Sequence, residues 1–173
     1  LNVKNPNLSN VVRVRLTRAP IELSGLADSN YQRFIKKPMP ALSLFSLEGN
    51  QAILVSDYVG KIVVLDFWAS WCAMCYQPVA KLQALSSQHP EWNGRVELIA
   101  VTIDSDLSRA RRVIARKGWN KTSHHSVKTK AFREIGLSVI PLVIIIAPDG
   151  TIASMSGAHA IDVEDEVEAL LAK

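Results

Sequence analysis

The sequence predicts an α/β domain built on a sheet with parallel strands and covering helices. Two observations predict it. Short apolar runs rich in valine and isoleucine alternate with segments of helical periodicity, which is typical of parallel strands joined by crossover helices. One of the apolar runs leads directly into a Cys-x-x-Cys motif at the start of a helix. At 173 residues, with 48% hydrophobic and 21% charged residues, the chain is long enough to bury the core that such a domain needs.

The segment 61–75, KIVVLDFWASWCAMC, is the most informative one. Its apolar residues 62–65 are predicted to form a buried strand, and helical periodicity follows over 73–88. This order places Cys72 at a helix N-terminus, where unpaired N–H groups and the helix dipole favour a thiolate. Cys75 lies one turn later, close enough to form a disulfide with Cys72. The motif therefore predicts a thiol–disulfide exchange site, with Cys72 as the attacking sulfur and Cys75 as the resolving one.

The remaining elements have local signals of their own. Ser105 or Asp106 can cap a helix, and Gly118 can close it. The predicted strands are 42–47, 51–55, 95–103, 124–127, 142–147 and 151–156, the first two forming a hairpin. The predicted helices are a turn at 56–58 and longer segments at 106–117, 130–135 and 162–172.

The leading segment differs in charge from the rest of the chain. Residues 1–40 contain seven Lys and Arg against two acidic residues, a net charge of +5, so the remainder carries −1 of the total of +4. The prolines of KKPMP, at 36–40, favour extended chain and mark a boundary. We expect a basic extension at 1–37 and one domain at 38–173. Residues 11–16 alternate apolar and basic side chains like a half-buried strand, which would be the last strand of a preceding domain or a strap along this one; a solvated linker is the alternative.

The sequence pattern and the charge distribution also predict how the protein is targeted and which classes of partner it binds. No run approaches the roughly 18 apolar residues that span a bilayer. The chain begins at Leu1 without a signal-peptide pattern, so we expect a mature or trimmed product, with a membrane tether upstream of residue 1 as one arrangement. Because the basic excess lies outside the part that carries the cysteines, we expect no nucleic-acid partner.

The two cysteines both lie in the motif, which argues against a disulfide scaffold. A zinc site would need two further ligands, and His124 and His125 are the only adjacent histidines. Neighbouring residues on a strand point in different directions, so this pair lacks the spacing of common zinc sites. We expect no metal; a zinc site and two inert core cysteines are the alternatives.

Asp66 interrupts the buried strand, six residues before Cys72. An ionised, unpaired carboxylate inside a strand is costly, so its pKa is expected to rise. Asp66 is therefore predicted to be a third catalytic residue that accepts the proton of Cys75. The alternative is a carboxylate that reaches solvent or a backbone donor.

Several motifs together resemble the thioredoxin superfamily. The segment 66–75, DFWASWCAMC, is similar to its active-site segment, and Ile140-Pro141 before a strand and the turn at 148–150 is similar to its cis-proline loop and final hairpin. The N-terminal hairpin and the extra helix–strand insertion after residue 105 resemble the TlpA/ResA-like branch. The resemblance covers about residues 38–173 and implies a central mixed β-sheet flanked by helices.

The resemblance also implies roles for particular residues. A cis Pro141 would lie beside the disulfide, the Ile140 backbone would pair with a substrate chain, and Trp68 and Trp71 would line the site. The expected substrate-binding residues are Trp71, Ala73, Met74, Ile140 and Pro141. The sequence departs from the family pattern in three places. Pro78 stands where many members of the branch have a glutamate, and Leu142 stands where threonine is frequent. Between the two cysteines, Ala73-Met74 replaces the residues that tune the redox potential of relatives.

The branch implies an extracytoplasmic reductant of proteins. Its cofactor would be its own Cys72–Cys75 disulfide, and its partners would be thiol- or disulfide-bearing proteins and a redox partner protein, with the chain expected to be a monomer. One alternative is a non-catalytic redox-sensing or protein-binding module. Another is a peroxiredoxin-like thiol peroxidase, whose P-x-x-x-T-x-x-C pattern is absent around Cys72.

Overall fold

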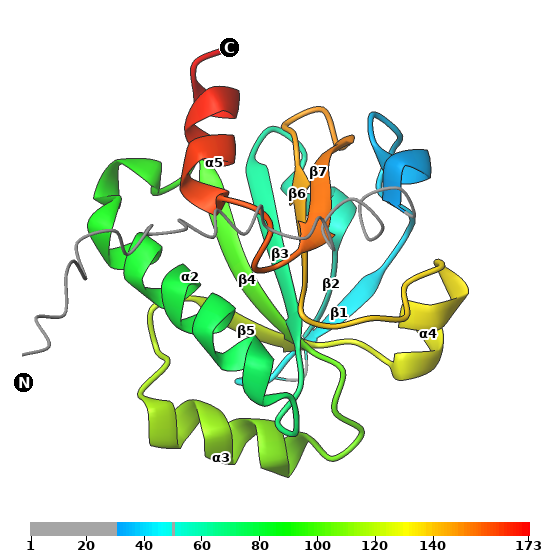
Figure 1. The fold of residues 1–173 in the computed structure, drawn as a ribbon, viewed down its shortest axis with the longest axis vertical. Helices are drawn as coiled ribbons and strands as arrows, with labels where there is room; N and C mark the ends of the chain where they lie inside the picture. Colours follow the sequence, from blue (N-terminus) through cyan, green and yellow to red (C-terminus); the bar gives the residue numbers. More distant parts are fainter. Residues whose placement is uncertain (1–30, 50) are drawn as a thin grey trace, which may run out of the picture.

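The computed structural model describes residues 31–49 and 51–173, which form a seven-stranded mixed sheet with helices on both faces (Figure 1). The strand order is β2-β1-β5-β4-β3-β6-β7. The three central strands β5, β4 and β3 are mutually parallel, and every other pairing is antiparallel. The strands are β1 (Ser43–Ser46), β2 (Ala52–Leu54), β3 (Ile62–Trp68), β4 (Val96–Thr102), β5 (Ser123–Ser126), β6 (Leu142–Ile146) and β7 (Ile152–Gly157).

The helices cover both faces of this sheet, as the alternation in sequence predicts. The α-helices are α2 (Tyr76–Gln88), α3 (Leu107–Lys117), α4 (Thr129–Glu134) and α5 (Val163–Leu171). Short 3-10 helices are η1 (Gln32–Phe34), η2 (Val55–Tyr58), η3 (Ala73–Cys75) and η4 (Pro90–Trp92). The predicted α/β class, the N-terminal hairpin β1–β2 and the extra unit α3–β5 are therefore confirmed.

All seven residues of β3 are buried, so this strand contributes to cores on both sides of the sheet. On one side Val63, Leu65 and Phe67 pack with Phe132 of α4. On the other side the alternate residues of β3 face α2, α3 and α5. Burying a strand on both faces requires apolar residues throughout, which is why the sequence of β3 is continuous rather than alternating.

The predicted helix ends are confirmed by their caps. The Asp106 carboxylate accepts the Ser108 N–H at the start of α3, and Gly118 ends the helix in the left-handed conformation with φ 67°. A residue with a side chain is strained at that φ, so glycine suits the position. Asp162 caps α5 in the same way as Asp106 caps α3.

The packed domain begins before the boundary that the sequence predicts at residue 38. Tyr31 is buried in the core, and Phe34 packs against the same cluster. The Lys36 N–H donates to the Ile152 carbonyl (2.8 Å), and the Ile152 N–H donates to the Lys37 carbonyl (2.9 Å). Residues 31–37 thus belong to the folded domain, because their apolar side chains and backbone bonds join them to β7.

The strand expected at 11–16 lies outside the described residues. Within the described ranges, no helix has the length and apolarity needed to cross a membrane.

Candidate active site

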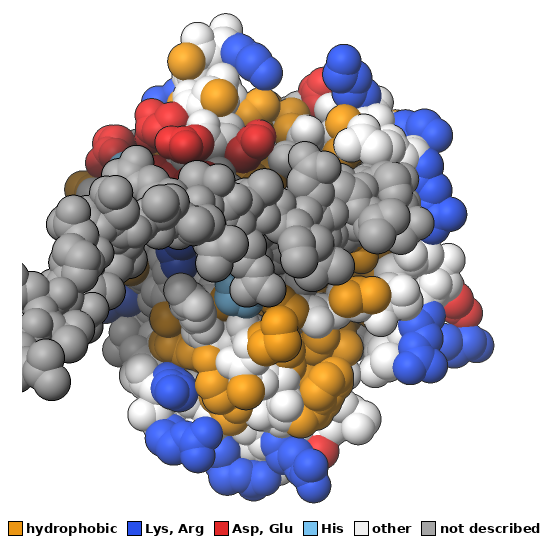
Figure 2. Space-filling view, viewed as in Figure 1, with side chains coloured by type: hydrophobic (Ala, Val, Ile, Leu, Met, Phe, Trp, Pro, Cys, Tyr) orange, Lys and Arg blue, Asp and Glu red, His pale blue; other side chains and the backbone are white. Residues whose placement is uncertain are grey.

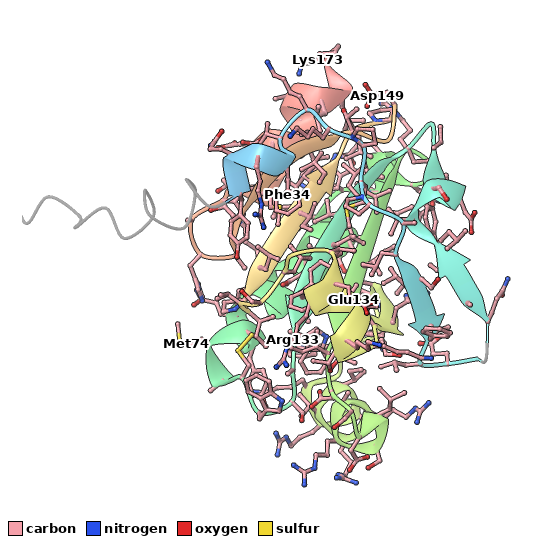
Figure 3. The ribbon with its side chains drawn as sticks, turned by 90° about the vertical axis from the view of Figure 1, so that its right-hand side faces the viewer. Phe34, Met74, Arg133, Glu134, Asp149 and Lys173 are labelled. Atoms are coloured by element: carbon pink, nitrogen blue, oxygen red, sulfur yellow. A yellow bond between two sulfur atoms is a disulfide. The ribbon has the colours of Figure 1, made fainter. Side chains whose placement is uncertain are left out.

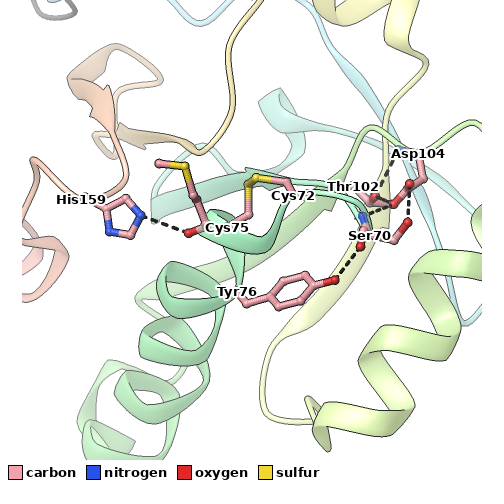
Figure 4. Close-up of a disulfide and its surroundings, with 8 residues drawn as sticks. Ser70, Cys72, Cys75, Tyr76, Thr102, Asp104 and His159 are labelled. Atoms are coloured by element: carbon pink, nitrogen blue, oxygen red, sulfur yellow. Dashed lines mark hydrogen bonds between the residues drawn. A yellow bond between two sulfur atoms is a disulfide. The ribbon is translucent and has the colours of Figure 1, made fainter.

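The Cys-x-x-Cys motif lies at the carboxyl end of β3, in the short turn that connects this strand to α2 (Figure 4). Cys72 and Cys75 form a disulfide with an S–S distance of 2.11 Å and a Cα–Cα distance of 5.4 Å. The Cys72 N–H donates to the Ala69 carbonyl, and the Cys75 N–H donates to the Cys72 carbonyl. The predicted disulfide is confirmed, and the strand–turn–helix context is the one expected.

The helix after Cys72 starts as a 3-10 turn. Cys72 occupies the N-cap position of η3, which continues directly into α2. The predicted helix over 73–88 is therefore present, with a tighter first turn than an α-helix. Cys72 remains at the N-terminal end, where backbone N–H groups lack helical partners.

The two sulfurs differ in their access to solvent. Cys75 is fully buried against Trp68 and Val79, whereas Cys72 is partly exposed. Around Cys72 the surface is apolar: Trp71 is 65% exposed and Met74 68% exposed. Met74 projects from the surface beside the disulfide (Figure 3). A partner protein can therefore reach the sulfur of Cys72, whereas the sulfur of Cys75 is shielded from solvent.

Asp66 lies in the middle of β3 and is 1% exposed. Its register partners are Ala100 of β4 and Val143 of β6, and its position on β3 puts it on the same face as Trp68. That face packs against α2, whose preceding turn carries Cys75. Neither carboxylate oxygen has a hydrogen-bond partner among the described residues. Burial raises the pKa of the Asp66 carboxyl well above its ordinary value.

The Ile140–Pro141 segment reaches the same end of the sheet from β6. Its peptide bond is cis. Leu142, the next residue, pairs with Phe67 of β3, so Pro141 lies next to the point where β3 leads into the motif. Ile140 packs against the same cluster as Cys72, and Val139 is 58% exposed. The structure thus brings the expected binding residues of both segments to one surface.

A carboxylate that the sequence analysis did not single out holds the active-site turn. Asp104, buried after the end of β4, accepts hydrogen bonds from the Ser70 N–H (2.7 Å), the Ser70 hydroxyl (2.8 Å) and the Thr102 hydroxyl (2.7 Å) (Figure 4). The Tyr76 hydroxyl donates to the Ser70 carbonyl (2.5 Å). Ser70 is therefore fixed on both sides, two residues before Cys72. The available signal was an acidic residue directly after an apolar strand.

His159 is a second contact that sequence reasoning missed. Its Nε2 lies 3.0 Å from the Met74 carbonyl oxygen, across 85 residues of sequence (Figure 4). A carbonyl only accepts, so the Nε2–H donates. The imidazole comes from the connection between β7 and α5 and contacts the backbone between the two cysteines.

The histidines considered for metal binding are elsewhere. His124 is buried in β5 with its Nε2 3.1 Å from the Trp119 carbonyl oxygen, and burial lowers the pKa of both His124 and His125. Among the described residues, His89, Glu91 and Glu168 place ligand atoms within 4.8 Å of one another. This group lies at the far end of α2 from the disulfide and is already engaged in hydrogen bonds with its neighbours.

A mixed sheet that ends in a Cys-x-x-Cys turn beside a cis-proline loop defines a thioredoxin-like protein. A family model described as thioredoxin-like matches residues 60–152, and the chain belongs to this family. It is 27% identical over 144 residues to the thiol-disulfide oxidoreductase ResA of Oceanobacillus iheyensis, covering 81% of this chain and 74% of that protein. It is 28% identical over 120 residues to the thiol:disulfide interchange protein DsbE of Allochromatium vinosum, covering 68% and 64%.

Other relatives are matched over a smaller part of their length. The chain spans 11% of the Arabidopsis thaliana protein SUPPRESSOR OF QUENCHING 1 and 52% of the thioredoxin-like protein YneN of Bacillus subtilis. Among solved structures, the thioredoxin domain of a Bacteroides vulgatus thiol-disulfide oxidoreductase has a TM-score of 0.65 at 15% identity, covering 80% of this chain and 96% of that one. These similarities agree with the TlpA/ResA-like resemblance and with the fold.

Proposed function

We propose that the protein is a thiol–disulfide oxidoreductase that reduces disulfides in protein substrates. The observation that carries the proposal is the disulfide itself, with a partly exposed Cys72, a fully buried Cys75 and an apolar rim. The relatives named as a thiol-disulfide oxidoreductase and as a thiol:disulfide interchange protein support it. This geometry suits two successive exchange reactions on one surface.

In the first step the Cys72 thiolate of the reduced protein attacks one sulfur of the substrate disulfide. A Cys72–substrate bond forms, the substrate S–S bond breaks, and the second substrate sulfur leaves as a thiolate that takes a proton from water. The helix N-terminus favours the Cys72 thiolate. Trp71 and Met74, both exposed, supply apolar contact to the bound chain.

In the second step Cys75 releases the substrate. Its thiol gives up a proton, its sulfur attacks Cys72, and the remaining substrate sulfur leaves as a thiolate. The substrate gains two electrons, and the protein is left with the Cys72–Cys75 disulfide. Because Cys75 is buried, its proton needs an acceptor inside the protein. Asp66 is the proposed acceptor, directly or through one water, since its carboxyl faces the same side of the sheet.

Insulin reduction in the presence of dithiothreitol tests the proposal. We expect the protein to accelerate insulin precipitation, and Cys72→Ser to abolish the effect. Cys75→Ser should accumulate mixed disulfides between Cys72 and the substrate. A protein whose disulfide is reducible but which shows no turnover would instead be a redox-sensing or protein-binding module. Consumption of peroxide without insulin reduction would indicate a thiol peroxidase.

The working environment is part of the same proposal. We propose that the protein acts outside the cytoplasm, as a monomer that receives electrons from a redox partner protein. The resemblance to the TlpA/ResA-like branch supports this location. Labelling of Cys72 by a membrane-impermeant maleimide in intact cells would test it, and labelling only after lysis would contradict it.

A further inference from the structure

Two helices of the domain each carry several charges of a single sign. α3 contains Arg109, Arg111, Arg112, Arg116 and Lys117 and no acidic residue. α5 contains Glu164, Asp165, Glu166 and Glu168 and no basic residue. Figure 2 shows Lys and Arg side chains gathered at the end of the molecule where Figure 1 places α3, and Asp and Glu side chains near α5.

The basic helix borders the active site. Leu107, Ala110 and Val113 of α3 pack into the same cluster as Cys75. Lys117 Nζ lies 5.3 Å from the centre of the Tyr76 ring, and Tyr76 directly follows Cys75 in the chain. In Figure 2 apolar side chains lie next to the basic edge. A protein bound over the disulfide therefore meets the α3 cations at its border.

The acidic helix lies toward the other end of α2. His89, which follows the last residue of α2, is 3.2 Å from Glu164, and Trp92 donates to Glu168. α2 has 13 residues, so its two ends are about 20 Å apart. The charge thus changes sign along α2, from positive near the disulfide to negative at the far end.

The α3 cations are largely free to act on a partner. All five are exposed. Within the described part of the chain, the one ion pair that an α3 cation makes joins Arg109 to Asp106 at 3.5 Å. Arg111 donates to the Leu47 carbonyl and Arg112 to the Ser108 hydroxyl, both neutral acceptors that leave the positive charge in place.

A cavity of about 480 Å³ adjoins this helix and offers a place for a partner side chain. Its walls include Phe45 and Val127, and the cations Arg111 and Lys128 line it as well. Asp104 also contributes; its carboxylate accepts three hydrogen bonds from the neutral donors of Ser70 and Thr102 and keeps its charge, so the lining has two cations against one anion. The cavity therefore suits a side chain that ends in a carboxylate.

We propose that α3 and this cavity form a docking surface that selects protein disulfides flanked by acidic residues. The inference rests on the proposed reductase function and names its substrate class. Clefts and surfaces of one sign raise the encounter rate of oppositely charged partners. A nucleic acid or an anionic membrane is disfavoured, because residues 41–173 carry a net charge of −1 and the acids of α5 would face an extended polyanion.

Three synthetic peptides with the same internal disulfide test the proposal, one flanked by glutamate, one by glutamine and one by lysine. Their reduction by the reduced protein is followed by stopped-flow tryptophan fluorescence. At low ionic strength we expect the glutamate peptide to react about 10-fold faster than the lysine peptide. The ratio should approach one at about 1 M salt, where the Debye length is about 3 Å.

Charge reversal on the protein assigns the preference to α3. Arg112→Glu/Arg116→Glu should reduce or invert the ratio between the glutamate and lysine peptides. Arg95→Glu/Lys173→Glu makes the same change in net charge far from the motif, since Arg95 precedes β4 and contacts the last turn of α5; this variant should keep the ratio. If reversal impairs folding, Arg112→Gln/Arg116→Gln should still lower the ratio, by a smaller factor.

The outcomes separate this inference from the proposed function. Equal rates for all three peptides at low salt would overturn the docking surface and leave the reductase function intact. Failure to reduce even the glutamine peptide would overturn both. An equal loss of selectivity in the Arg95/Lys173 variant would show a net-charge effect and refute the α3 surface. Binding to phosphatidylglycerol vesicles that depends on α3, without peptide preference, would assign the surface to a membrane instead.

Discussion

Replacing Asp66 should make the protein more stable and slower at releasing substrate. The carboxyl is 1% exposed, and neither oxygen has a hydrogen-bond partner among the described residues. A buried polar group without a partner costs about 1–3 kcal/mol. Asp66→Ala removes this cost but leaves a small cavity, which returns about 1 kcal/mol. The expected net gain in the free energy of unfolding near neutral pH is therefore up to about 2 kcal/mol, and each kcal/mol raises Tm by about 2–4 °C.

The gain should depend on pH in a defined direction. Burial raises the folded pKa of Asp66 above its unfolded value of about 3.9. The parent protein is therefore relatively most stable below that unfolded pKa, and it loses stability as pH rises toward the folded pKa. Asp66→Asn cannot ionise, so its advantage over the parent should grow across this window. Denaturant unfolding of the oxidised proteins from pH 3 upward measures the difference.

The kinetic effect is measured with Ellman's reagent, which forms a mixed disulfide with Cys72 and releases one thiolate; attack by Cys75 then releases a second. Asp66→Asn should slow the second release by ~10²-fold, as loss of a general base does, and leave the first unchanged. Asp104→Asn is the matched control for the stability measurement. This buried carboxylate accepts three hydrogen bonds, so its replacement should destabilise the fold, which is the opposite of the effect expected at Asp66. If Asp66→Ala lowers the free energy of unfolding and leaves the second release untouched, Asp66 is a structural acceptor and its catalytic role is withdrawn.

Three further predictions follow from the packing of the site and the domain edge. Iodoacetamide should label Cys72 before Cys75 in the reduced protein, because only Cys72 reaches the surface, and mass spectrometry showing the reverse order would refute the assignment. Asp104→Asn should cost about 1–3 kcal/mol in urea unfolding, because the two donors of Ser70 go to different carboxylate oxygens and one of these becomes an NH2 group, which cannot accept; an unchanged midpoint would mean that these hydrogen bonds contribute nothing. A chain starting at residue 38 should be less stable than one starting at Tyr31 by about 2–4 kcal/mol, from lost apolar burial and two backbone bonds to β7, and equal thermal midpoints would return the domain boundary to residue 38.

The sequence by itself determined the features that depend on near neighbours in the chain. The buried strand β3, the caps Asp106 and Asp162 and the Cys72–Cys75 disulfide all involve residues within a few positions of one another. Backbone propensity, capping and hydrophobic period act over that distance, so reading residues in order is sufficient. The isolated carboxyl of Asp66 was predictable for the same reason, since the strand around it is uniformly apolar.

The tertiary structure decided which distant residues serve the site. The Asp104 clamp on Ser70 spans 34 residues and the His159 contact with Met74 spans 85. Likewise, β1 pairs antiparallel with β5, and Tyr31 packs on the core. The local sequence patterns of these segments do not predict which other segment they contact. Polar residues after strands and in loops are common, and their roles depend on which strand ends the sheet brings together. Which strand ends lie together is set by the simultaneous burial of both faces of β3. This burial is a property of the whole domain and not of any single segment.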